Sequence, residues 1–112
     1  MNREIKKLLF DILNSILRIE EYITQPKKFE EYEKNTMLQQ AVERNIEIIG
    51  EATNILLKKN PDFPITNARK IVNTRNRIIH GYDDIENAEI WSVVINHLPK
   101  LKEEIEALLN AK

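Results

Sequence analysis

Hydrophobic residues recur at spacings of three and four positions along most of this chain. In the first segment they are Ile5, Leu8, Leu9, Ile12, Ile16 and Ile19. This period predicts an amphipathic helix, because residues at these spacings share one helical face. We expect the helix to fade near Thr24-Gln25-Pro26, since proline disfavours helical backbone in the residue before it. The charged stretch that follows, residues 27–35, fits either a short helix or a loop.

A second helix is predicted to begin at Thr36, where Thr36 and Gln39 have the spacing of a capping box. Its apolar stripe consists of Met37, Ala41, Ile48, Ala52 and Ile55. The sequence NPDFP at residues 60–64 is the clearest break in the chain, because proline and turn-forming residues occur together there. We therefore expect the second helix to end before Asn60.

A third helix is predicted from about Asn67 to His80, and Gly81 is a natural residue to end it. Asp83 and Asp84 then offer start signals for a last helix. The hydrophobic positions of that last helix are Ile90, Trp91, Val94, Ile95, Leu98, Leu101, Ile105 and Leu108.

Pro99 lies inside this last helix and should kink or split it. We find no pattern typical of a strand, a repeat or an interdomain linker. The elements together predict an all-α fold, an antiparallel four-helix bundle with room for an extra short helix and with a kinked last helix. At 112 residues the chain is expected to form one domain, residues 1–112.

Composition narrows the class of protein. The chain is 42% hydrophobic and 31% charged, which is typical of a globular protein. Its formal net charge of -1 argues against coating nucleic acid through bulk positive charge, but a local basic site is compatible with it. The chain has no cysteine, which excludes disulfides and thiolate metal sites. Its apolar runs are far shorter than the roughly 20 residues of a membrane span. Residues 1–15 lack the hydrophobic region of a signal peptide, so we expect a cytoplasmic protein that does not contact a membrane.

Arg75 occupies an unusual position on the predicted third helix. On a helical wheel of about 100° per residue, it lies at the centre of the apolar stripe rather than on the solvated face. A guanidinium there keeps its charge, so it needs a carboxylate, a phosphate or an interface partner. One interpretation is a structural ion pair, with Glu51 of the second helix as the candidate partner. The other is a binding or catalytic site.

A local basic strip surrounds Arg75. Between Phe63 and Tyr82 the sequence contains no acidic residue, but it contains the basic side chains Arg69, Lys70, Arg75, Arg77 and His80. His80 lies five residues after Arg75, and the helix end beside it frees it from strict wheel geometry, so the two could converge on one pocket together with Asn76. For Arg69 and Lys70 we favour the alternative of a solvated helix face near the negative end of the helix dipole.

Other candidate residues carry weaker signals. His97 is a lone histidine on a helix rich in core residues, and we expect a structural or surface role for it. Trp91 is expected to be a core anchor. The chain has no glycine-rich phosphate loop, and the spacing of its histidines and carboxylates predicts no metal site.

The motif Arg75, four residues, His80, one residue, Tyr82 resembles the signature of HEPN-domain proteins, and in particular of the HepT toxins. Two further blocks support the resemblance, AVERNIEIIGEA at residues 41–52 and IWSVVINHLPKL at residues 90–101. The resemblance covers almost the whole chain, and the three blocks occur in the order and at the spacing of that family.

The resemblance implies a HEPN-type bundle that forms a homodimer and acts as a metal-independent endoribonuclease without a cofactor. It further implies the toxin of a type VII-like toxin–antitoxin pair, whose partner is a nucleotidyltransferase antitoxin of the MNT class. By resemblance, Arg75 and His80 take the catalytic positions and Asn76 the supporting polar position. Tyr82 matches the tyrosine that the antitoxin adenylylates.

Two other functions remain open from the sequence alone. Related helical bundles serve nucleotidyltransferases as non-catalytic subunits, in which Arg75 and His80 would bind a nucleotide or substrate phosphate. A purely structural dimeric bundle with an internal ion pair is the third interpretation. Cleavage of RNA by the purified protein would separate the first function from both alternatives.

Overall fold

The computed structural model describes residues 2–23, 28–81 and 85–111, and every regular element within these ranges is a helix. The longest helices are α1 (Arg3–Tyr22) and α3 (Thr36–Lys59), and α4 (Ala68–Ile79) is shorter. The short helix α2 (Phe29–Glu33) precedes α3. The C-terminal part consists of α5 (Asn87–Ser92), the π-helical turn η1 (Val93–His97) and α6 (Leu98–Asn110) in direct succession. The predicted all-α fold is therefore confirmed.

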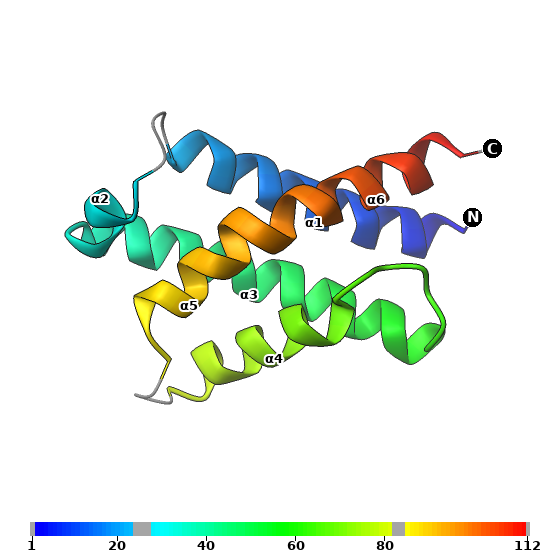
Figure 1. The fold of residues 1–112 in the computed structure, drawn as a ribbon. Helices are drawn as coiled ribbons and strands as arrows, with labels where there is room; N and C mark the ends of the chain where they lie inside the picture. The colour runs from blue at the N-terminus through cyan, green and yellow to red at the C-terminus, as the bar shows by residue number, and fades with distance from the viewer. Residues whose placement is uncertain (1, 24–27, 82–84, 112) are drawn as a thin grey trace.

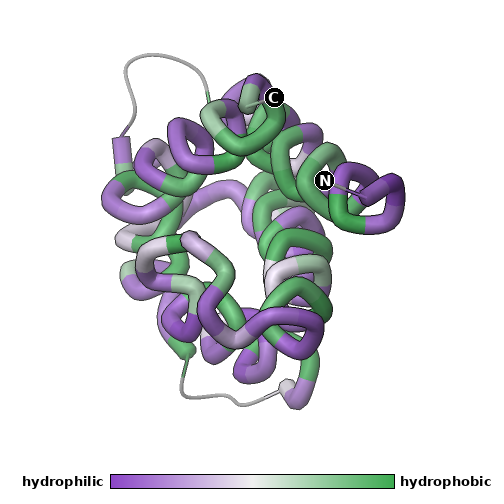
Figure 2. The backbone as a smooth tube through the Cα atoms, turned by 90° about the vertical axis from the view of Figure 1, so that its right-hand side faces the viewer, coloured by the Kyte–Doolittle hydropathy of each residue, from purple (hydrophilic) through white to green (hydrophobic). Residues whose placement is uncertain are grey.

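The helices form an elongated bundle around α3 (Figure 1). α1 and α3 run antiparallel, and an ion pair between Glu4 and Lys59 joins the beginning of one to the end of the other. α6 returns beside α1, while α4 packs almost entirely on α3 (Figure 1). Hydrophobic and hydrophilic stretches alternate along each helix, as the predicted amphipathic pattern requires (Figure 2).

The hydrophobic core lies where these helices meet. Its fully buried large side chains are Tyr32, Leu9, Ile12, Ile16, Ile19, Ile46, Ile49, Leu56, Ile71, Ile90, Leu101 and Ile105. Trp91 is half-buried and packs on this core, with its ring centroid 5.2 Å from that of Tyr32 and 6.2 Å from that of Phe29. These aromatic contacts attach α2 to α5, which agrees with the anchor role expected of Trp91.

α3 begins at Thr36, as predicted, but its capping residue differs from the expectation, and so does the start of α5. Asn35, not Thr36, caps α3, because its side-chain oxygen accepts a hydrogen bond of 3.0 Å from the backbone N–H of Leu38. α5 begins at Asn87, where a capping box forms between Glu86 and Glu89. The start signals expected from Asp83 and Asp84 fall outside the described residues.

The last helix distorts just before Pro99, as predicted. Proline has no N–H to donate, and its ring would clash with the carbonyl four residues earlier in a regular α-helix. The chain meets this constraint with η1, in which the backbone N–H of Leu98 bonds to the carbonyl of Val93, five residues back. In the described part of the chain, no helix is long and apolar enough to cross a membrane.

Candidate active site

Arg75 lies at the closest approach of α4 to α3. A Cβ atom built on Gly50 of α3 would be 2.8 Å from the Cγ of Arg75 and still nearer to its Cβ, and it would be 3.4 Å from the carbonyl oxygen of Ile71. Real Cβ atoms do not approach other atoms this closely, so position 50 has room for glycine alone. The aliphatic part of Arg75 therefore packs directly on the backbone of α3.

The guanidinium of Arg75 is incompletely satisfied. Its Nη1 donates a hydrogen bond of 2.9 Å to the side-chain oxygen of Asn76. Its Nε is buried and has no hydrogen-bond partner among the described residues. A buried donor of a charged group is costly to leave without an acceptor. Packing thus holds the stem of Arg75 in place, while its Nε makes no hydrogen bond among the described residues.

The ion pair considered between Arg75 and Glu51 does not form between the described side chains. Glu51 follows Gly50 on α3, so it projects about 100° away from the face that α4 covers. It is exposed, and it borders a shallow hollow between α1 and α3 together with Asp11 and Arg44. Among the described side chains, no carboxylate pairs with Arg75.

His80 marks the end of α4. Its backbone N–H donates to the carbonyl of Asn76 at 3.1 Å, and the N–H of Gly81 donates to the carbonyl of Ile78 at 3.2 Å. Gly81 has φ of 65°, the left-handed conformation in which glycine commonly ends helices. The side chain of His80 is exposed.

Arg75 lies on α4, and His80 caps the end of that helix. Asn76 lies between them along the chain and bonds to both, to the Arg75 guanidinium through its side chain and to the His80 backbone N–H through its carbonyl. No hydrogen bond joins the side chains of Arg75 and His80 within the described residues. Tyr82, the remaining residue of the motif, lies outside the described residues.

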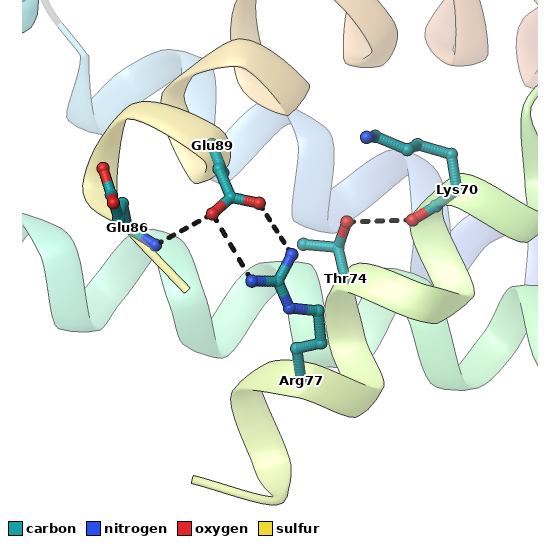
Figure 3. Close-up of polar contacts among 5 residues, drawn as sticks. All are labelled: Lys70, Thr74, Arg77, Glu86 and Glu89. Atoms are coloured by element: carbon teal, nitrogen blue, oxygen red, sulfur yellow. Dashed lines mark hydrogen bonds and ion pairs between the residues drawn. The ribbon is translucent and has the colours of Figure 1, made fainter. Parts of the chain in front are cut away.

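Arg77 of this basic strip pairs with Glu89 of α5 (Figure 3). Its Nη1 lies 2.6 Å from Oε2 of Glu89, and its Nη2 lies 3.4 Å from Oε1. The hydrogen bond from Arg77, followed by one from the Glu86 backbone, lowers the pKa of Glu89. A lowered carboxyl pKa means that the pair is intact above the usual value near 4.3 and is lost only as the pH falls through the lowered value. Arg69 and Lys70 are exposed, in agreement with the solvated face expected for them.

His97 contacts the residue before α4 and is not part of the arginine–histidine motif. Its Nδ1 lies 3.4 Å from Nδ2 of Asn67, the residue before α4, which has a left-handed backbone with φ of 62°. The N–H of Thr66 next to it donates to both carboxylate oxygens of Glu104 on α6, at 3.1 Å each. These contacts agree with the structural role expected of His97. Among the described residues, no three histidine, aspartate or glutamate side chains come close enough to hold a metal ion.

Sequence reasoning missed two residues that shape this region, Gly50 and Glu89. The signal for Gly50 was present, because glycine inside a helix costs about 0.5–1 kcal/mol relative to alanine and is expected only where backbones approach closely. Glu89 gave no such signal. Its pairing with Arg77 depends on how α5 lies beside α4, which the sequence pattern does not specify.

The structure is an all-α bundle with an arginine–histidine motif at the end of one helix. Comparison with known proteins shows to which family such a bundle belongs. The family described as "Ribonuclease HepT-like" matches residues 12–108. This chain belongs to that family of HEPN proteins.

Individual relatives agree with the family. "Probable ribonuclease HepT" of Thermococcus cleftensis is 34% identical over 112 residues, covering 96% of this chain and 98% of the relative. "Putative RNase MJ1380" of Methanocaldococcus jannaschii is 35% identical over 105 residues, covering 93% of this chain and 95% of the relative. No solved structure matches this chain significantly.

The contact between Gly50 and Arg75 generates a first prediction. Gly50→Ala should lower the free energy of unfolding by about 1 kcal/mol, because overpacking costs roughly 1–3 kcal/mol and alanine returns about 1 kcal/mol of helix propensity. Thermal unfolding followed by circular dichroism measures the difference. Glu51→Ala on the same helix is the control, since Glu51 is exposed and its removal should change stability by less than about 0.5 kcal/mol. A Gly50→Ala protein more stable than the parent would contradict the close contact.

Proposed function

We propose that this protein is a metal-independent endoribonuclease and the toxin of a type VII-like toxin–antitoxin pair. The observation that carries the proposal is the state of Arg75, a packed, half-buried guanidinium that bonds to Asn76 and pairs with no carboxylate among the described residues. It lies on the helix that the exposed His80 caps at its C-terminal end. A phosphate of RNA would bind the part of this half-buried guanidinium that solvent reaches, because arginine presents several donors in a geometry that suits phosphate oxygens.

The residues suit RNA cleavage through the ribose 2′-hydroxyl. In that reaction the 2′-oxygen attacks the adjacent phosphorus, and the bond from phosphorus to the 5′-oxygen breaks. A base must take the proton of the 2′-hydroxyl, and an acid must protonate the leaving 5′-oxygen. Histidine titrates near neutral pH and can serve in either role, while Arg75 would stabilise the negative charge that develops on the phosphate oxygens. Asn76 would hold the Arg75 guanidinium through the hydrogen bond between their side chains.

A homodimer would complete this site. One chain supplies a single motif histidine, whereas the reaction needs both a base and an acid. A twofold axis close to the end of α4 would bring two His80 and two Arg75 side chains to one cleft. Ile79 beside His80 is 41% exposed, and a partner chain would cover this apolar surface.

Tyr82 is proposed as the site of control by a nucleotidyltransferase antitoxin of the MNT class. It follows His80 by two residues, so an adenylyl group on its hydroxyl would carry a phosphodiester charge close to the motif. That phosphate would compete with RNA for Arg75, and the nucleoside would obstruct the site. Inhibition would then need no unfolding of the bundle.

The assembly is tested directly by mass. We expect multi-angle light scattering at micromolar concentration to give twice the mass of one chain. An Ile79→Glu protein should shift towards monomer, because it would place two charges in the proposed interface. A monodisperse monomer of the parent protein would refute the shared cleft.

Catalysis is tested on a single-stranded RNA with the purified protein. His80→Ala and Arg75→Ala should each reduce cleavage at least about a hundredfold, because each removes a proton-transfer group or a charge stabiliser, and the helical circular dichroism should be unchanged. Addition of EDTA should leave the parent rate unaltered. The mechanism would be refuted if His80→Ala cleaved RNA at the parent rate, or if the parent protein lost its activity in EDTA.

Nucleotide binding without any cleavage would favour the alternative function, a non-catalytic partner of a nucleotidyltransferase.

Control through Tyr82 is tested by co-expression with a cognate nucleotidyltransferase antitoxin of the MNT class. The toxin should gain the mass of one or more adenylyl groups on Tyr82 and lose cleavage activity. Tyr82→Phe should fold, remain unmodified and stay active, because only the hydroxyl acceptor is removed. Intact-mass spectrometry with peptide mapping gives the result. A silenced toxin with unmodified Tyr82 would mean that the antitoxin acts in another way.

A further inference from the structure

We propose that the ion pair between Arg77 and Glu89 is a clamp that positions His80 for the ribonuclease reaction. The inference rests on the function proposed above and assigns a positioning role to two residues outside the arginine–histidine pair. Arg77 lies two residues after Arg75 and three before His80 on the same helix. Residues three apart on a helix are neighbours on one face, so the clamp acts one turn before His80.

The pair has the geometry of a two-point contact rather than of a loose surface ion pair. Both terminal nitrogens of Arg77 bond to Glu89, one to each carboxylate oxygen, at 2.6 and 3.4 Å (Figure 3). Paired contacts of this kind fix orientation as well as distance. Arg77 is 32% exposed and Glu89 46% exposed.

Glu89 is also part of the start of α5. Its Oε1 accepts a hydrogen bond of 3.3 Å from the backbone N–H of Glu86, which forms one half of the capping box. A single carboxylate therefore binds the end of α4 and the beginning of α5 (Figure 3). It fixes the two ends of the connection that contains Gly81.

Among the polar contacts between described side chains, this ion pair is the one that joins the last turn of α4 to another helix. The middle of the helix is fixed on α3 by the contact between Arg75 and Gly50. Its beginning is fixed by the contacts of Thr66 with Glu104 and of Asn67 with His97. Beyond Arg75, Ile78 is half-buried but Ile79 and His80 are exposed, so core packing constrains them little.

The same geometry argues against Arg77 as a ligand of substrate phosphate. Its terminal nitrogens already bond to a carboxylate, and an arriving phosphate would be repelled by Glu89. Arg75 presents the contrasting case, because it bonds to the amide of Asn76 and to no carboxylate among the described residues. In this proposal Arg75 binds the substrate phosphate, and Arg77 positions His80.

The consequence is a kinetic effect with a distinct signature. A proton-transfer group displaced by about 1 Å can cost up to a hundredfold in rate, while the substrate still binds. Loss of the clamp should therefore reduce kcat about ten- to a hundredfold and leave KM within about twofold.

The experiment compares Glu89→Gln with Glu20→Gln in a continuous assay on a fluorogenic single-stranded RNA. Glu20 pairs with Lys102 across α1 and α6 at 3.0 Å, and its exposure of 40% is close to that of Glu89. Glu89→Gln should show the fall in kcat, and Glu20→Gln should match the parent.

The charge-reversed double variant Arg77→Glu/Glu89→Arg should have a higher kcat than either of its single reversals. If Glu89→Gln does not fold, Arg77→Lys replaces it, because lysine keeps the charge but loses the two-point contact.

A second readout tests the clamp without catalysis. The ring resonances of His80 in a heteronuclear NMR spectrum should shift in Glu89→Gln and be unchanged in Glu20→Gln. If the parent protein does not cleave RNA, the proposed function fails, and these resonances still decide the clamp. Unchanged resonances together with an unchanged kcat in Glu89→Gln would overturn the inference. A rise in KM at constant kcat would overturn it as well, because Arg77 would then be a substrate-binding residue.

Discussion

The close approach of α4 to α3 at Gly50 is the constraint on which the rest of the site depends. A glycine inside α3 costs about 0.5–1 kcal/mol relative to alanine, yet any larger residue would collide with the Cβ and Cγ of Arg75. The contact resolves the difficulty of placing a charge on an apolar stripe. The stem of Arg75 is buried against backbone, and its charged end extends beyond the contact to Asn76.

Polar contacts at both ends complete the placement of α4. At its start, Thr66 and Asn67 bond to Glu104 and His97 of the last helix. Near its end, Arg77 bonds to Glu89. Exposed ion pairs of this kind contribute only about 0–1 kcal/mol to stability. Their importance is geometric, because core packing alone would hold α4 only along the side that faces α3.

The sequence was sufficient for the fold because helical periodicity is a local property. It predicted the long helices, the break after Lys59 and the distortion before Pro99, each of which follows from neighbouring residues. The helical wheel also placed Arg75 correctly on the inner face. It did not distinguish between an ion pair with Glu51 and a guanidinium without a carboxylate partner, because that depends on which side chain of α3 meets α4.

The same limit explains the missing pieces of the site. Gly50 becomes meaningful only when α4 is seen to cross it, and Glu89 only when α5 is seen beside Arg77. Both depend on the relative placement of the helices. The hydrophobic period shows which face of a helix is buried, but not which residues of a neighbouring helix that face meets. The helix caps show the limit at short range, since Asn35 and Thr36 are both good capping residues and only the hydrogen bond to Leu38 decides between them.

The charge distribution explains how a protein with a net charge of -1 can present a cationic site. The stretch from residue 63 to residue 81 has no acidic side chain, and its motif lies towards the C-terminal end of α4, where the helix dipole favours positive charge. Glu89 cancels the charge of Arg77 but leaves that of Arg75. For the ribonuclease function proposed here, this means few phosphate contacts in each protomer. RNA would then be held by a small, precisely placed pair of groups rather than by a broad basic surface, and the position of those groups would matter more than their number.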